Sequence, residues 1–165
     1  MRKFIEKQLA LLQIDADTIR RVRSMQRVVD AGLDSIVREF YRHMLTFPEG
    51  KALFSSAETV QQLANKQREH WRKLFACTFD ETFVKTAQTV GQAHYRHRVA
   101  PYLYIAGYTF FHGEIARVLC ERYSGHRELP DMLVAMTRII GLDMDLAISI
   151  YTKEYWSHTE PPTDI

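Results

Sequence analysis

The residues that interrupt regular backbone are few in this chain. Its 165 residues include seven glycines and five prolines, and neither type occurs between Lys51 and Val90. Valine, isoleucine and threonine nowhere alternate with polar residues for long, as they would in half-buried strands. The chain is therefore predicted to fold as an all-helical domain.

Capping residues and apolar periodicity predict where the helices lie. Asp15 and Asp80 can act as N-caps, because a short acidic side chain accepts a hydrogen bond from the first turn of a helix. Pro101 and Pro130 suit the first turn of the last two helices, whereas Pro48 is expected to end a segment. The predicted helices span about 2–13, 17–31, 33–45, 59–76, 80–97, 101–122 and 130–155.

Composition excludes several functional classes. A hydrophobic content of 46% supports a buried core, and a formal net charge of +2 without a basic block argues against nucleic-acid binding. No apolar run approaches the roughly 20 residues of a membrane span, and the N-terminus lacks the cleavage site of a signal peptide. Cys77 and Cys120 have no metal-ligand spacing, which fits free thiols in a reducing compartment. We expect one cytoplasmic domain with no nucleic-acid or membrane partner.

The last two predicted helices are apolar on more than one side. In 130–155, one stripe contains Met136 and Ile140, and another contains Ile139 and Leu146. A helix that is apolar on two sides is buried on two sides. One side can face the domain core while a second copy of the chain covers the other as a four-helix bundle. The alternative is a central pair of helices fully buried within one domain.

His94 is the most informative histidine. It follows Val84, Ala87 and Gly91 at spacings of three and four, which places it on an apolar helix face. A buried histidine needs a hydrogen-bond or metal partner, and Gly91 leaves room for a large group one turn earlier. The spacing alone leaves open a core histidine bonded to a carbonyl or a metal ligand. His97, which stands between two arginines, is expected to be exposed.

Two aromatic residues have similar alternatives. Tyr41 lies on the apolar side of its helix and is either a core side chain or a hydroxyl that faces a ligand. Trp71 stands in a polar helix and is expected to anchor that helix to the core. The chain has no Glu-x-x-His pairs, no glycine-rich phosphate loop and no nucleophile elbow, so no hydrolytic or di-iron chemistry is indicated.

Three segments together resemble the globin-coupled sensor family. Val90 to Tyr108, VGQAHYRHRVAPYLYIAGY, resembles its F-to-G helix region, where a histidine and a basic residue precede a short turn and a helix that begins near a proline. Arg38 to Leu45, REFYRHML, resembles the second helix of that family with its distal tyrosine. Trp71 matches a tryptophan in the distal helix of some relatives. The order and spacing agree over nearly the whole chain.

The resemblance implies a globin-like fold that binds haem b, with an extra N-terminal helix and a dimer built on the long last two helices. His94 would be the proximal iron ligand through Nε2. Tyr41 would be the distal residue that donates a hydrogen bond to bound dioxygen. Tyr104 resembles a proximal-side tyrosine that contacts the ligating histidine in some relatives.

The remaining pocket positions follow by counting. Trp71 places Ala64 and Gln67 at the distal positions that face the ligand, where relatives often have leucine and a small or hydroxyl residue. Gln67 could add a second hydrogen bond. His97 and Arg98 depart from the apolar residue and glycine that relatives often carry there. Large apolar side chains must line the slot, and the candidates are Phe40, Leu45, Phe54, Leu63, Val90, Val99 and Leu103.

By this resemblance the chain is expected to be a gas sensor and not itself an enzyme. Residues 1–157 would form the sensor domain and 158–165 the start of a linker to a C-terminal effector, most often a diguanylate cyclase. Dioxygen, carbon monoxide and nitric oxide are the expected ligands, and His70 or His97 could in principle approach the iron. One rival is a cofactor-free helical dimerisation module. The other is a haem enzyme acting on peroxide or nitric oxide, which would need a more polar distal pocket.

Overall fold

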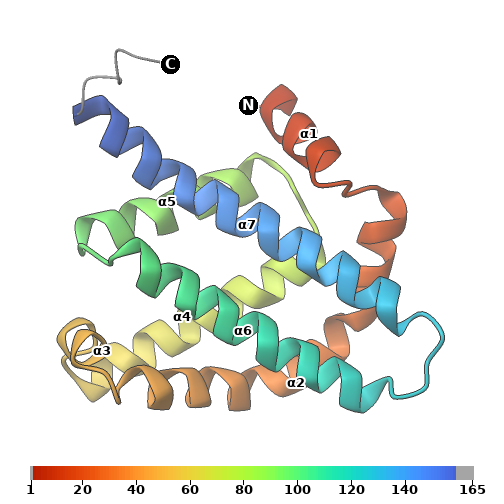
Figure 1. The fold of residues 1–165 in the computed structure, drawn as a ribbon, viewed down its shortest axis with the longest axis horizontal. Coiled ribbons are helices and arrows are strands. Elements are labelled where there is room, and N and C mark those ends of the chain that lie inside the picture. The colour runs from red at the N-terminus through yellow and green to blue at the C-terminus, as the bar shows by residue number, and fades with distance from the viewer. Residues whose placement is uncertain (1, 159–165) are drawn as a thin grey trace.

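The computed structural model describes the backbone of residues 2–158 and the side chains of residues 5–149. Every regular element within that range is a helix, which confirms the predicted fold class (Figure 1). No helix in the described part of the chain has the length and apolarity needed to cross a bilayer. The helices are α1 Arg2–Leu11, α2 Ala16–Met44, α3 Pro48–Leu53, α4 Ala57–Ala76, α5 Glu81–Arg96, α6 Pro101–Arg122 and α7 Leu129–His158.

Side-chain caps fix the beginnings of three helices. Asp15 accepts a 2.8 Å hydrogen bond from the backbone N–H of Thr18, and Asp80 accepts one of 2.8 Å from Phe83. These contacts confirm both predicted N-caps. Ser56 caps α4 in the same manner. Each such cap is worth about 1 kcal/mol, so the beginnings of α2, α4 and α5 are encoded locally.

Two predictions about helix boundaries are wrong. Segments 17–31 and 33–45 form the single helix α2, because Gly32 continues the helix and lies against the side chain of Val118 from α6. Pro48 begins α3 instead of ending a helix. Gly50 then passes so close to α2 that a Cβ atom there would lie 2.0 Å from the Met44 carbonyl oxygen. Pro48 thus takes the first helical position that proline favours, and the buried face of α2 runs on through Gly32.

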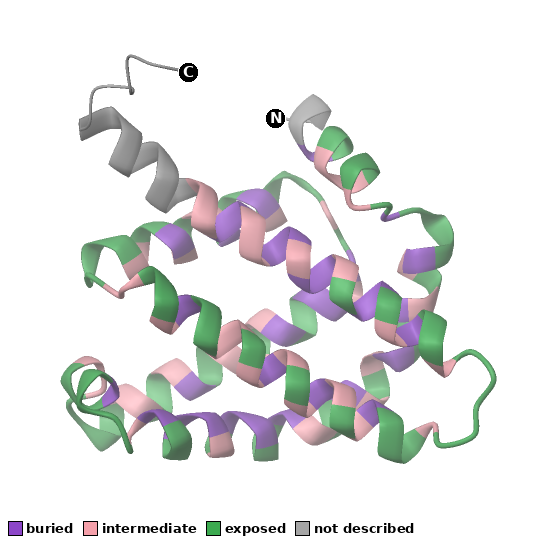
Figure 2. Ribbon diagram, viewed as in Figure 1, coloured by how far each residue is buried: buried purple, intermediate pink, exposed green. Residues whose placement is uncertain are grey.

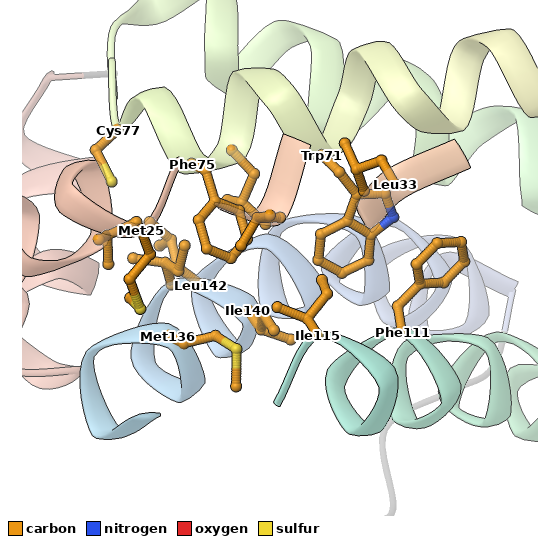
Figure 3. Packing of buried hydrophobic residues seen from close by; sticks show 14 of the residues in the cluster. Met25, Leu33, Trp71, Phe75, Cys77, Phe111, Ile115, Met136, Ile140 and Leu142 are labelled. Atoms are coloured by element: carbon orange, nitrogen blue, oxygen red, sulfur yellow. The ribbon is translucent and has the colours of Figure 1, made fainter. Parts of the chain in front are cut away.

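The long helices form two layers. Helices α6 and α7 run antiparallel across the front of the molecule, with α5 behind α7 and α4 behind α6 (Figure 1). Helix α2 packs against α4, α6 and α7. Buried positions face inward between these layers (Figure 2). The core brings side chains of α2, α4, α6 and α7 together (Figure 3): Met25, Leu33, Trp71, Phe75, Ile115 and Leu142.

The chain itself covers most of the two apolar stripes predicted on the last helix. Met136, Ile139, Ile140 and Leu146 are all buried within one copy of the chain. Helix α7 is thus largely covered within one copy of the chain, whereas α6 has only four buried residues and does not form a fully buried pair with it. Large apolar side chains that remain exposed on the front pair of helices are Tyr102 (60%), Ile105 (47%) and Val134 (49%).

Candidate functional site

Tyr41 lies near the C-terminal end of α2 in an aromatic pocket. Its side chain is only 4% exposed, and its ring meets Phe40 and Phe54 edge-on at centroid distances of 5.0 and 5.1 Å. No hydrogen bond from the described residues reaches its hydroxyl. Burial raises the pKa of Tyr41 well above its ordinary value, against a smaller opposing effect of Arg68. The side chain therefore keeps its proton and offers a buried donor.

Helix α4 supplies the predicted distal positions. Ala64 is buried and Gln67 is half-buried. The carboxamide oxygen of Gln67 accepts a 3.1 Å hydrogen bond from Trp71 Nε1, so this oxygen is already engaged. Trp71 itself is buried and stacks on Phe111 with centroids 4.9 Å apart. Trp71 is thus an anchor for α4, as predicted.

His94 is half-buried on α5 and has one ring nitrogen fixed. Its Nδ1 lies 2.8 Å from the carbonyl oxygen of Val90. A carbonyl can only accept, so Nδ1 carries the proton and the Nε2 lone pair is left for another partner. Burial lowers the pKa of His94, and the hydrogen bond to Val90 opposes this effect. This hydrogen bond is compatible with both alternatives for His94, because either a core histidine or a proximal iron ligand would donate from Nδ1 to a carbonyl.

The end of α5 is held by a pair of backbone hydrogen bonds. The Arg98 N–H donates to Tyr95 and the Val99 N–H donates to the carbonyl of His94. This is a Schellman arrangement, and its left-handed residue is Arg98 with φ of 54°. Glycine takes this conformation at little cost, whereas arginine does so under strain. The turn borders an open pocket of about 500 Å³ lined by Tyr95, Arg96, Arg98, Val99, Ala100 and Pro101.

Tyr104 joins His94 to a buried polar network. The two rings meet edge-on at 5.0 Å. Tyr104 Oη donates to Tyr108 Oη at 3.0 Å, and Tyr108 Oη donates to Asp143 Oδ2 at 2.6 Å. The same Asp143 oxygen lies 2.7 Å from His70 Nε2. His70 is therefore engaged by a carboxylate, while His97 is exposed as predicted.

Sequence reasoning missed the Asp143 end of this network. One signal was available: Asp143 stands within the apolar sequence IIGLDMDLAI, where an acid on a helix buried on two sides needs a partner. No local pattern identifies that partner. His70 is 73 positions away and Tyr108 is 35 positions away.

Aromatic contacts connect the distal and proximal candidates through one continuous path. From Tyr41 it passes to Phe40, whose ring meets Phe111 at 4.9 Å, and then to the stacked Trp71. Trp71 meets Tyr108, which leads through Tyr104 to His94. The other predicted lining positions are all half-buried: Leu45, Phe54, Leu63, Val90, Val99 and Leu103.

The donor set fits a haem group. Imidazole is a usual haem ligand, and His94 presents a neutral imidazole with Nδ1 already donating to a carbonyl. The Tyr41 hydroxyl is a protonated donor without a partner among the described residues, and large aromatic side chains surround it. His94 and Tyr41 are therefore the residues that would hold and face such a group.

Comparison with known proteins agrees with this geometry. Residues 2–157 match the protoglobin family model. The globin domain of the Geobacter sulfurreducens globin-coupled sensor superposes with a TM-score of 0.82 at 16% identity, covering 88% of this chain and 96% of that one. The ferric globin domain of Escherichia coli DosC gives a TM-score of 0.69 at 16% identity, covering 90% and 97%.

A sequence relative has a longer chain. The haem-based aerotactic transducer HemAT of Halobacterium salinarum is 24% identical over 157 residues, which cover 89% of this chain and 32% of that protein. This chain thus spans about a third of its length. The fold is that of the globin domains of globin-coupled sensors. The chain belongs to the protoglobin family, and membership of this globin family implies that it binds haem.

Arg98→Gly is expected to raise the free energy of unfolding by about 1 kcal/mol, because it relieves the left-handed strain. Urea unfolding measures the change. Arg96→Gly is the matched control, because Arg96 ends the right-handed helix and glycine there should cost about 0.5–1 kcal/mol. A loss of stability in both variants would contradict this account of the turn.

The ion pair of His70 with Asp143 predicts a specific pH dependence. Burial alone would lower the pKa of His70, but the charge and hydrogen bond of Asp143 outweigh it, so the pKa is raised. The pair therefore contributes full stability below the ordinary histidine value of about 6.5, and this contribution is lost as pH rises through the raised value. The positive charge of Lys73 lowers the pKa of His70 and so opposes the effect of Asp143.

His70→Gln should lower the free energy of unfolding by about 1–2 kcal/mol near pH 6, and by less at roughly pH 9. Urea titrations of both proteins across this range measure the gap. His43→Gln, at an exposed position on α2, is the control. A gap that stays constant or widens with rising pH would contradict the assignment.

Proposed function

We propose that this chain is a haem b oxygen-sensor domain in which His94 ligates the iron through Nε2. The observation that carries the proposal is the state of the His94 ring. Nδ1 donates to the Val90 carbonyl, the ring is held edge-on by Tyr104, and burial favours the neutral form. These three features orient Nε2 and keep its lone pair available.

Tyr41 is proposed to be the distal hydrogen-bond donor. When bound, haem supplies the ferrous centre at which dioxygen, carbon monoxide or nitric oxide is taken up. Tyr41 would donate a hydrogen bond from Oη to a gas ligand that carries partial negative charge. Ala64 adds no polar group. Gln67 is held by Trp71 through its oxygen, so its amide nitrogen is the part left to support a ligand. Phe40, Leu45, Phe54, Leu63, Val90, Val99 and Leu103 are proposed to line the apolar slot.

Signal transfer is proposed to run through α6 and α7. His94 stands on α5, and four residues separate the end of α5 from Pro101 at the start of α6. Tyr102 and Ile105 near the start of α6 and Val134 near the start of α7 are exposed apolar side chains that a homodimer would cover. A ligand that binds two dimer arrangements with different affinity shifts their populations.

The output is proposed to lie in a further domain. Residues 1–157 would be the sensor and 158–165, mostly outside the described residues, the start of a linker. A cytoplasmic diguanylate cyclase is the proposed effector. The relatives support a further domain of some kind: HemAT is named an aerotactic transducer and extends well beyond the matched region, and the Geobacter domain belongs to a globin-coupled sensor.

An absorption spectrum tests haem ligation first. The purified chain is expected to show a strong Soret band that shifts when dioxygen or carbon monoxide is added to the ferrous form. His94→Ala should not show this spectrum, because the substitution removes the proposed iron ligand. His97→Ala, three residues away and exposed, should leave the spectrum unchanged. A chain that remains colourless after haemin is added would favour the cofactor-free helical module.

Tyr41→Phe should speed dioxygen release by roughly ten- to a hundredfold, because a hydrogen bond to a charged acceptor is worth about 1.5–3 kcal/mol. Stopped-flow displacement of dioxygen measures the rate. Tyr123→Phe serves as the control, because it removes the hydroxyl of a tyrosine just after the C-terminal end of α6. If Tyr41→Phe releases dioxygen at the unaltered rate, Tyr41 is not the distal donor.

A further inference from the structure

A single carboxylate on α7 lies at the centre of the buried polar network. Asp143 is 1% exposed. Its Oδ2 accepts from Tyr108 Oη at 2.6 Å and pairs with His70 Nε2 at 2.7 Å. Its Oδ1 has no hydrogen-bond partner among the described residues. Burying a carboxylate is costly, and well-packed apolar side chains often stabilise a core as well or better. Stability alone therefore does not account for an acid at this position.

One arm of the network leads to the proximal side. A carboxylate only accepts hydrogen bonds, so Tyr108 must donate to Asp143, and the Tyr108 oxygen is then free to accept from Tyr104. This order of donors sets the rotation of both hydroxyls. The ring of Tyr104 in turn meets the His94 ring edge-on at 5.0 Å. These contacts link the His94 ring to an acceptor on α7 by way of two tyrosines of α6.

The other arm leads to the distal side. His70 lies on α4, the helix that also carries Ala64, Gln67 and Trp71. Because His70 and Tyr108 meet at the same oxygen, α4 and α6 are joined through one atom of α7. If α4 moved away from α6, Asp143 could keep both of these short hydrogen bonds only by moving as well.

We propose that Asp143 is a positioning residue that holds His94 through Tyr108 and Tyr104 and ties this proximal arm to α4 through His70. This inference rests on the proposed function, in which His94 ligates the haem iron. Partners that orient a metal-ligating histidine typically change metal affinity 10- to 100-fold when they are replaced. Asp143 is proposed to act on His94 indirectly, through Tyr108 and Tyr104.

The test compares Asp143→Asn and Tyr108→Phe with a matched control. Asp145→Asn removes a carboxylate of the same charge two residues further along α7, outside the network. The readout is the iron–histidine stretching band in the resonance Raman spectrum of the ferrous, haem-loaded protein. Asp143→Asn and Tyr108→Phe are expected to shift or broaden this band and to speed haem loss about tenfold, while Asp145→Asn leaves both unchanged. Tyr108→Phe keeps the ring and tests the link if Asp143→Asn folds poorly.

A double-mutant cycle separates positioning from a general loss of structure. If Asp143 acts through Tyr104, Asp143→Asn should have no further effect on the band in a Tyr104→Phe background. Equal effects in both backgrounds would overturn the proposal, and so would a band that neither Asp143→Asn nor Tyr108→Phe moves. Absence of the band from the unaltered protein, or its survival in His94→Ala, would instead overturn ligation by His94.

Discussion

Helix α2 presents one continuous apolar face, and the other long helices pack against it. Its buried side chains recur at spacings of three and four from Val22 to Met44. Full burial of one such side chain is worth about 1.5–3 kcal/mol, and α4, α6 and α7 all contact this helix. Tyr41 is part of the same face. The packing of α2 in the core therefore also places the hydroxyl of Tyr41, the proposed distal donor.

The rotation of α4 about its own axis is set mainly by apolar contact. Arg68 pairs with Asp34 and Arg72 with Asp30, but ion pairs near the surface contribute little to stability. Trp71 is buried, stacked on a neighbouring aromatic ring and hydrogen-bonded to its own helix. This indole fixes the rotation of α4 and with it the direction of the proposed distal positions and of the His70 side chain.

The parts of the structure that were predictable depend on local chemistry. The caps at Asp15 and Asp80, the start of α6 at Pro101 and the apolar face of His94 all follow from residues within a few positions. Gly32 was wrongly interpreted as a break, because a single glycine costs a helix only about 1 kcal/mol and the apolar face of α2 continues past it. The Asp143 network joins residues distant in sequence, so the motif that carried His94, Tyr104 and Tyr108 did not reveal the acceptor that holds Tyr108.

The turn after α5 has a mechanical consequence. The carbonyl of His94 is bonded to the N–H of Val99, and Arg98 is fixed in a left-handed conformation between them. Two residues later α6 begins at a proline, whose φ is fixed by its ring. The connection between α5 and α6 is therefore short and conformationally restrained, so it behaves as a rigid link and not as a hinge. If the last turn of α5, which carries His94, is displaced, the first turn of α6 must move with it, and this turn lies beside the exposed Tyr102 and Ile105.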